Sequence, residues 1–315
     1  MNLLAECSKA KRIGISGHIR PDGDCVGSCL ALYQYLQKAL PAASVEVFLE
    51  NPPEVFADIC GFGLIRQPEK KEQFDVFFAL DCNAERLGSA EECFCGAIKK
   101  INIDHHITNK GDGDVNLVRP EVGSCSEVLF ELMEKEYMDG EIAKALYIGM
   151  IHDTGVFQYS NTRPQTMRIA AELIEYGFDF PAIVQETFYQ KSYLQTQIMG
   201  RVLMESVRFL DNRCIVGCVD RKTMEFYDIT SKDMDGIVNQ LRNIKGIDCA
   251  IFMYETAMQE FKVSLRTSDL VDATRVVSRF GGGGHMRAAG CTMQGTFHDC
   301  VNNLSGLIEE QLKGN

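Results

Sequence analysis

Three apolar stretches of this chain each run directly into residues that can bind metal ions. Residues 12–17, 74–80 and 100–103 have the pattern of buried strands, and an acidic or histidine-rich segment follows each of them. The side chains at these strand ends are His18, Asp22, Asp24, Asp81, Asp104, His105 and His106. In an open parallel α/β sheet, ligands bind outside the carboxyl ends of the strands, so we expect these side chains to gather in one crevice. Carboxylate oxygens mixed with imidazole nitrogens suit Mn²⁺ or a similar divalent ion better than Ca²⁺.

The first part of the chain, residues 1–185, alternates short apolar runs with helical patterns, which is typical of repeated βαβ units. Two more strands are expected at residues 44–49 and 115–118. Helices are expected at residues 26–40, 124–133, 141–151 and 164–176, and Ser124 is the expected N-cap of the second of these. The pattern therefore predicts an α/β domain built on a mostly parallel, doubly wound sheet.

The pattern changes in the second part of the chain. Residues 186–208 form an amphipathic stretch that we interpret as a connector, and residues 209–315 as a smaller, separate α/β domain. Strands are expected there at residues 214–219, 249–254 and 261–265, and helices at residues 231–243, 272–280 and from about residue 297. We expect the active site to lie in the cleft between the two domains.

Charge and composition exclude some classes of function. The net charge of −12 argues against a broad binding platform for long nucleic acids, which needs many Lys and Arg side chains. No apolar run approaches the roughly 20 residues that span a membrane, and the first residues lack the pattern of a secretory signal. A cytoplasmic location is the default expectation. The 13 cysteines include no CxxC pair, so we expect them to be mostly buried and reduced.

The order of these motifs resembles a known family. His18-x-x-Pro21-Asp22-x-Asp24, Asp81, Asp104-His105-His106-x-x-Asn109 and Asp153-Thr-Gly resemble, in this order, the four motifs of the DHH phosphoesterase superfamily. Residues 281–290 resemble the glycine-rich GGGGH motif of the C-terminal domain that accompanies one branch of that superfamily. The resemblance covers residues 13 to 290, which is nearly the whole chain.

The resemblance implies a site with two divalent metal ions, most simply Mn²⁺, that share Asp81. His18 and Asp22 would complete the protein ligands of one ion, and Asp24, His105 and Asp153 those of the other. Asp104 would lie just behind the ligands and orient an imidazole. The +4 charge of two such ions balances the carboxylates of Asp22, Asp24, Asp81 and Asp153, so a substrate phosphate needs further donors. His106 is the expected donor in this part of the chain, which makes Asp104 and His106 the predicted catalytic residues.

The other expected phosphate donors lie in the second part of the chain. Arg266 follows a predicted strand, and a guanidinium can bind a phosphate through two hydrogen bonds. The glycine tract lets the backbone approach a phosphate closely, and the imidazole that follows it can bind the same anion. The predicted substrate-binding residues are Arg266, Gly281, Gly282, Gly283, Gly284 and His285.

By resemblance, the leading hypothesis is a metal-dependent phosphoesterase that degrades short RNA to mononucleotides and removes phosphate from 3′-phosphoadenosine 5′-phosphate. Hydrolysis of linear or cyclic dinucleotide messengers is the alternative within the same chemistry. A non-catalytic RNA- or nucleotide-binding protein is a further alternative, but it predicts a degraded metal cluster. The stretch from Phe188 to Met204 is apolar enough to contribute to a homodimer.

Overall fold

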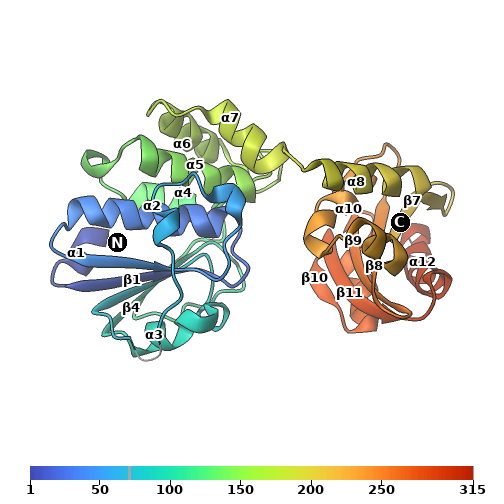
Figure 1. The fold of residues 1–315 in the computed structure, drawn as a ribbon, viewed down its shortest axis with the longest axis horizontal. Helices are drawn as coiled ribbons and strands as arrows, with labels where there is room; N and C mark the ends of the chain where they lie inside the picture. Colours follow the sequence, from blue (N-terminus) through green and yellow to red (C-terminus); the bar gives the residue numbers. More distant parts are fainter. Residues whose placement is uncertain (70–71, 315) are drawn as a thin grey trace. The chain divides into compact units, whose positions relative to one another are not determined.

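The computed structural model describes residues 1–69 and 72–314. The chain divides into two compact units, residues 1–190 and residues 191–315. Each unit has its own sheet and its own buried core (Figure 1). Of the helices in the described parts of the chain, none is long and apolar enough to cross a membrane.

The first unit is built on a five-stranded parallel sheet with the strand order β2-β1-β3-β4-β5. Its strands are β1 (Arg12–Ser16), β2 (Ser44–Phe48), β3 (Val76–Leu80), β4 (Lys99–Asp104) and β5 (Val115–Val118). From β1, the chain adds β2 on one side of the sheet and then adds β3, β4 and β5 on the other side. Open α/β sheets bind their ligands where the strand order changes direction in this way, which here is between β1 and β3. The predicted parallel α/β architecture is therefore confirmed, and all five strands lie where the sequence pattern places them.

Alternate residues of the central strands pack into two different layers, as the two-residue period of a strand requires. Ile13, Ile15 and Phe78 belong to the larger core, whereas Phe77 belongs to a smaller cluster of aromatic and small side chains on the other face. The helices α2 (Gly23–Ala39), α4 (Cys125–Leu132), α5 (Gly140–Asp153) and α6 (Pro164–Ile174) lie on one side of the sheet, and the short α3 (Glu91–Gly96) lies on the other (Figure 1). The strands are thus covered on both faces.

Shorter elements complete the first unit. They are α1 (Leu3–Cys7), η1 (Glu54–Phe56), η2 (Phe62–Leu64), η3 (Ala84–Arg86), η4 (Gly88–Ala90), η5 (Lys135–Tyr137), α7 (Phe180–Val184) and the π-helical turn η6 (Gln185–Tyr189).

Two helix boundaries differ from the sequence expectation in ways that affect the site. Helix α2 begins at Gly23 rather than near residue 26, because the side chain of Asp22 caps it by accepting hydrogen bonds from the N–H groups of Asp24 and Cys25. Helix α5 extends through Asp153 instead of ending near residue 151. Asp24 and Asp153 therefore lie on regular helical backbone and not on loops.

The second unit has a six-stranded mixed sheet with the order β10-β11-β9-β8-β7-β6. Its strands are β6 (Val207–Phe209), β7 (Cys214–Val219), β8 (Cys249–Ala257), β9 (Glu260–Thr267), β10 (Gly283–His285) and β11 (Ala288–Gln294). Its helices are α8 (Tyr193–Glu205), α9 (Arg221–Tyr227), η7 (Ser231–Met234), α10 (Ile237–Arg242), α11 (Ala273–Val277), η8 (Ser278–Phe280) and α12 (Phe297–Lys313). The predicted smaller α/β domain is confirmed.

Much of the expected connector, residues 186–208, is regular structure. It contains α8, whose Ile198 and Val202 are buried against residues of the second unit, including Ile215 and Leu241. The single helix expected at residues 231–243 is instead two short helices, because Gly236 between them adopts φ +82°.

Candidate metal centre

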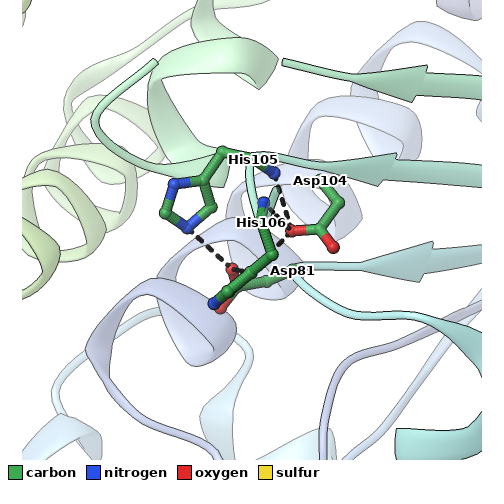
Figure 2. Close-up of side chains that lie close together, drawn as sticks. All are labelled: Asp81, Asp104, His105 and His106. Carbon is green, nitrogen blue, oxygen red and sulfur yellow. Dashed lines mark hydrogen bonds and ion pairs between the residues drawn. The ribbon is translucent and has the colours of Figure 1, made fainter. Parts of the chain in front are cut away.

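The residues predicted from the three strand ends lie close together in the structure. His18 and Asp81 follow β1 and β3, and the segment Asp104–His106 begins at the last residue of β4; these three strands are neighbours in the sheet. Asp153 reaches the same place from the end of α5. Figure 2 shows His105 and His106 beside Asp81 and Asp104 at the ends of two strands. The candidate metal centre therefore forms at the predicted edge of the sheet.

His18 belongs to the first of two overlapping groups of donor atoms. Its Nε2 atom lies 3.6 Å from Asp22 Oδ2 and 3.5 Å from Asp81 Oδ2. The other ring nitrogen, Nδ1, lies 2.9 Å from the carbonyl oxygen of Ile19, which suits a proton on Nδ1. That hydrogen bond leaves Nε2 as the free lone pair, directed at the two carboxylates.

His105 belongs to the second group. Its Nε2 atom lies 2.9 Å from Asp153 Oδ2, 3.3 Å from Asp81 Oδ1 and 3.9 Å from Asp24 Oδ2. The opposite nitrogen, Nδ1, lies 3.3 Å from the carbonyl oxygen of Val122. Asp81 therefore offers one oxygen to each group of donors, which is the arrangement expected of a ligand shared by two ions.

Asp104 lies behind these donors and is fully buried. Its Oδ1 atom accepts hydrogen bonds from the backbone N–H groups of His105 and His106, at 2.6 and 3.0 Å, and lies 2.8 Å from His106 Nδ1. The Asp104 carboxylate thus orients the His106 ring, whose side chain is 38% exposed. The geometry agrees with the orienting role expected for Asp104.

Divalent cations fit this centre by two criteria. Asp81 Oδ1 and His105 Nε2 are buried, and despite their close neighbours neither makes a hydrogen bond of acceptable geometry among the described residues, although buried polar atoms are normally satisfied. In addition, the donor atoms fall into groups whose members lie within 4.8 Å of one another. These groups are His18, Asp22 and Asp81; Asp24, His105 and Asp153; and Asp81, Asp104, His105 and His106.

The electrostatics of the centre show an excess of negative charge. Burial lowers the pKa of His18, but the neighbouring carboxylates of Asp22 and Asp81 outweigh that effect and raise it to about 12. Burial also opposes protonation of His105, yet Asp153 and Asp81 raise its pKa to about 12. Burial, followed by repulsion from Asp81 and Asp153, raises the pKa of Asp24 well above its usual range. Bound cations would offset this repulsion.

The first turn of α4 holds Asp24 in place. Asp24 is fully buried, and its two oxygens accept hydrogen bonds from the N–H groups of Cys125 and Ser126, at 2.6 and 3.0 Å. The predicted N-cap is confirmed, because Ser124 Oγ accepts a hydrogen bond from the N–H of Glu127. The first N–H groups of α4 are therefore already paired with a carboxylate and a hydroxyl of the protein itself.

A glycine in α5 makes room for Asp24. A Cβ atom added at Gly149 would lie 2.0 Å from Ser126 Oγ and 2.6 Å from Asp24 Oδ1. Glycine inside a helix costs roughly 0.5–1 kcal/mol relative to alanine, so its presence in the middle of α5 reflects this close approach. Gly149 allows α5 to carry Asp153 to the same centre as Asp24.

We expect Gly149→Ala to lower both stability and metal affinity. The added methyl group must displace Asp24 or the start of α4, at a cost of about 1–3 kcal/mol in the free energy of unfolding. Thermal unfolding and Mn²⁺ titration would measure the two effects. Gly306→Ala is the matched control, because Gly306 also lies within a helix and a Cβ there meets nothing within 4 Å. Equal stability of Gly149→Ala and the parent protein would contradict the steric argument.

In the second unit, the structure brings Arg266 and His285 to one region of the sheet. Ala288 in β11 pairs in register with Arg266 on β9 and with His285 on β10. Residues paired in this way point to the same face, and one intervening strand separates these two by roughly 10 Å. The Arg266 guanidinium donates a hydrogen bond to the Leu265 carbonyl at 3.0 Å.

The glycine tract is more ordered than a flexible loop. Gly281 adopts φ +69° and Gly284 φ +144°, and Gly283 and Gly284 lie in β10. The N–H groups of Gly281 and Gly282 donate to the carbonyls of Ser278 and Val277. A Cβ at Gly282 would lie 2.4 Å from the carbonyl oxygen of Gly290, so glycine is required there for strand packing. Gly283 is exposed, with open space around its Cα.

The cysteines follow the expectation for a reduced protein. All 13 are free thiols, and all except Cys60, Cys95 and Cys218 are buried. Burial raises the pKa of Cys25 and Cys82, which lie next to residues of the metal centre, well above the usual range. Thiols in such surroundings are poor nucleophiles at neutral pH.

Two residues of the site, Asn102 and Gly149, belong to none of the motifs that predict it. Both break a local rule, since Asn102 is a polar residue inside an apolar strand and Gly149 is a glycine inside a helix. Those irregularities were the available signals, and neither belongs to a recognised motif.

The fold and the centre together define a class of protein: a two-unit α/β protein whose parallel sheet presents a cluster of carboxylates and imidazoles suited to divalent cations. The family model "DHH family, N-terminal domain" matches residues 12–150, and the model "DHHA1 domain" matches residues 212–314. The chain belongs to the DHH family of phosphoesterases, as the motifs predict.

Curated relatives match over almost the whole chain. The "Bifunctional oligoribonuclease and PAP phosphatase NrnA" of Thermus thermophilus is 30% identical over 307 residues, covering 94% of this chain and 89% of that protein. The protein of the same name from Bacillus subtilis is 26% identical over 299 residues, covering 92% of each chain. Among solved structures, an exopolyphosphatase-related protein from Bacteroides fragilis matches with a TM-score of 0.87 at 26% identity, covering 97% of this chain and 94% of that one.

Proposed function

We propose that this protein hydrolyses short oligoribonucleotides to mononucleotides and removes the 3′-phosphate of 3′-phosphoadenosine 5′-phosphate. The observation that carries the proposal is the complete cluster around Asp81, in which every donor expected of a two-metal phosphoesterase is present and within reach. The names of the relatives from Thermus thermophilus and Bacillus subtilis support the choice of substrates. A non-catalytic binding protein would have no need for an intact cluster of this kind.

The proposed metal ligands are those that the sequence motifs imply, and two divalent ions would share Asp81. His18 and Asp22 would complete one set of ligands, and Asp24, His105 and Asp153 would complete the other. Mn²⁺ is the proposed ion because the donors mix carboxylate oxygen with imidazole nitrogen. When bound, such ions supply Lewis-acid stabilisation of the charge that develops on the phosphoryl oxygens.

The protein's own groups position the substrate. His106 donates its Nδ1–H to Asp104, which fixes the ring and raises the pKa of the imidazole, so that the protonated ring can donate Nε2–H to a phosphoryl oxygen of the substrate. In the second unit, Arg266 and His285 are the proposed ligands of a further phosphate, and the backbone of the Gly281–Gly284 tract allows that phosphate to approach closely. That both units bind one substrate molecule stays a prediction.

The test is a comparison of substrates with the Mn²⁺-loaded protein. The panel contains 5′-phosphorylated ribonucleotides of two to ten residues, 3′-phosphoadenosine 5′-phosphate, cyclic di-AMP and pyrophosphate, with products separated by chromatography. We expect rapid conversion of dinucleotides to mononucleotides, a rate that falls as the chain lengthens, and release of phosphate from 3′-phosphoadenosine 5′-phosphate. Preference for cyclic di-AMP would instead assign the protein to messenger turnover. Turnover of none of these compounds would contradict the proposal.

Location and assembly are the last parts of the proposal. A cytoplasmic location is supported by the 13 free cysteines, which are typical of a reducing compartment. A homodimer that uses residues 188 to 204 stays a prediction, and the exposure of Tyr193 and Met204, at 80% and 89%, supports it. Light scattering of the purified protein would measure its molar mass in solution.

A further inference from the structure

Asn102 is a polar residue in the middle of the buried strand β4. Its neighbours Ile101 and Ile103 pack into the larger core, and all three residues are completely buried. An amide placed there costs free energy unless all of its hydrogen-bonding groups find partners. Asn102 therefore has a specific set of partners that an apolar residue could not satisfy.

Those partners surround Asp81. The Nδ2 atom of Asn102 donates to the carbonyl oxygen of Ala79 at 3.1 Å and to that of Cys82 at 2.8 Å. One of these carbonyls precedes Asp81 by two residues and the other follows it directly. Because both partners are obligate acceptors, the orientation of the Asn102 amide group is unambiguous.

The backbone between these two carbonyls has an unusual conformation. Asp81 adopts φ +59°, in the left-handed region that residues with a side chain seldom occupy. Its N–H donates to the carbonyl of Ile103 at 3.0 Å, as a continuation of the β3–β4 pairing. Such a conformation persists only where the surroundings hold it, and the two hydrogen bonds from Asn102 hold it on either side.

A second amide links Asn102 to the segment that carries the two histidines. Asn109 Nδ2 donates to Asn102 Oδ1 at 2.9 Å and to Asp104 Oδ2 at 2.6 Å, and Asn109 Oδ1 accepts from the N–H of Gly111 at 2.8 Å. Every polar atom of both amide side chains is thus paired. The chain of hydrogen bonds from Asp104 through Asn109 and Asn102 ends at the turn that contains Asp81.

We propose that Asn102 is a positioning residue that holds Asp81 in the left-handed turn from which its carboxylate reaches both groups of donors. The proposal rests on the metal centre of the proposed function and extends it to a residue that does not touch the ions. Asp81 Oδ2 lies near His18 and Oδ1 near His105, so a rotation of this turn disturbs both groups at once.

The test is calorimetric titration of Mn²⁺ into metal-free Asn102→Leu and Asn102→Asp, without substrate. Leucine has a similar shape but donates nothing, and aspartate sets a carboxylate against the two carbonyl oxygens. We expect each variant to bind Mn²⁺ about 10- to 100-fold more weakly than the parent protein, which is the usual effect of removing a partner behind a metal site. The titrations are made well below the unfolding temperature of each variant, measured by circular dichroism.

Asn116→Leu is the matched control. Asn116 is paired in register with Asn102 on the adjacent strand β5, and its side chain bonds only to Gly113 among the partners that the structure gives for it. It should bind Mn²⁺ like the parent protein. Folded Asn102 variants with parental Mn²⁺ affinity would overturn the positioning role and leave the proposed activity standing. A parent protein that binds no Mn²⁺ would overturn the metal centre itself.

Discussion

Replacing Asp81 with asparagine is expected to remove nearly all phosphoester hydrolysis. Among the described residues, Asp81 is the one carboxylate that lies beside both His18 and His105, and it is almost completely buried. Asparagine keeps the shape but offers a neutral oxygen and an N–H group where two anionic oxygens are needed. If the ions supply several kcal/mol of transition-state stabilisation, a loss of about 4 kcal/mol lowers kcat/KM roughly 1000-fold. Steady-state kinetics with a diribonucleotide would measure the loss.

Asp58→Asn is the control for this prediction. It removes the same charge from the first unit, but the Asp58 side chain is 95% exposed and its partner is Lys144. Exposed ion pairs contribute little, so this variant should keep the parental kcat/KM and nearly the parental stability. If Asp81→Asn retained more than about a tenth of the parental activity at saturating Mn²⁺, Asp81 could not be the shared ligand that the geometry indicates.

The sequence predicted the architecture of the first unit well because its strands are unusually clear. Residues 76–80 are apolar throughout and fully buried. A short apolar run that leads into an aspartate has few interpretations other than a buried parallel strand. The position of the metal centre followed from the same pattern, because the carboxyl ends of parallel strands meet at one edge. The predicted donors do lie together there, at the distances given above.

The details that sequence could not supply depend on contacts between distant segments. Asp24 was expected on a loop, but Asp22 caps a helix that begins one residue earlier than Asp24. The support of Asp24 by the first turn of α4 joins residues about a hundred positions apart. The left-handed backbone of Asp81 and its hold by Asn102 are equally non-local, and no local pattern reports them.

The second unit was harder to predict at the two edges of its sheet, where strands β6 and β10 have only three residues each. The glycine tract has no side chains to show the alternation of a strand, yet Gly283–His285 pairs with β11. Helix α8 was taken for part of a connector, since only one narrow stripe of it, including Ile198 and Val202, is buried. Arg266 and His285 lie on either side of Ala288 because of the register in which β9, β11 and β10 pair, and the local sequence does not predict that register.

Removal of divalent cations is expected to have an effect as large as the loss of Asp81. Without cations, four carboxylates crowd together beside two imidazoles, and burial, followed by repulsion between the carboxylates, raises the pKa values of Asp24 and Asp153. Protein treated with a chelator should therefore show no measurable turnover. Mn²⁺ should restore it fully, whereas Ca²⁺, which prefers a shell of oxygen ligands, should not.

The same cations should stabilise the folded protein in a way that does not depend on activity. Binding to the folded state alone contributes about 2.7 kcal/mol per site when the free ion is at 100 times its dissociation constant. Thermal unfolding of the metal-free protein should accordingly shift to higher temperature on addition of Mn²⁺, and the shift should be small or absent in Asp81→Asn. An equal shift in both proteins would place the stabilising ions elsewhere on the surface. A metal-free parent protein that hydrolysed dinucleotides at the full rate would remove metal ions from the mechanism.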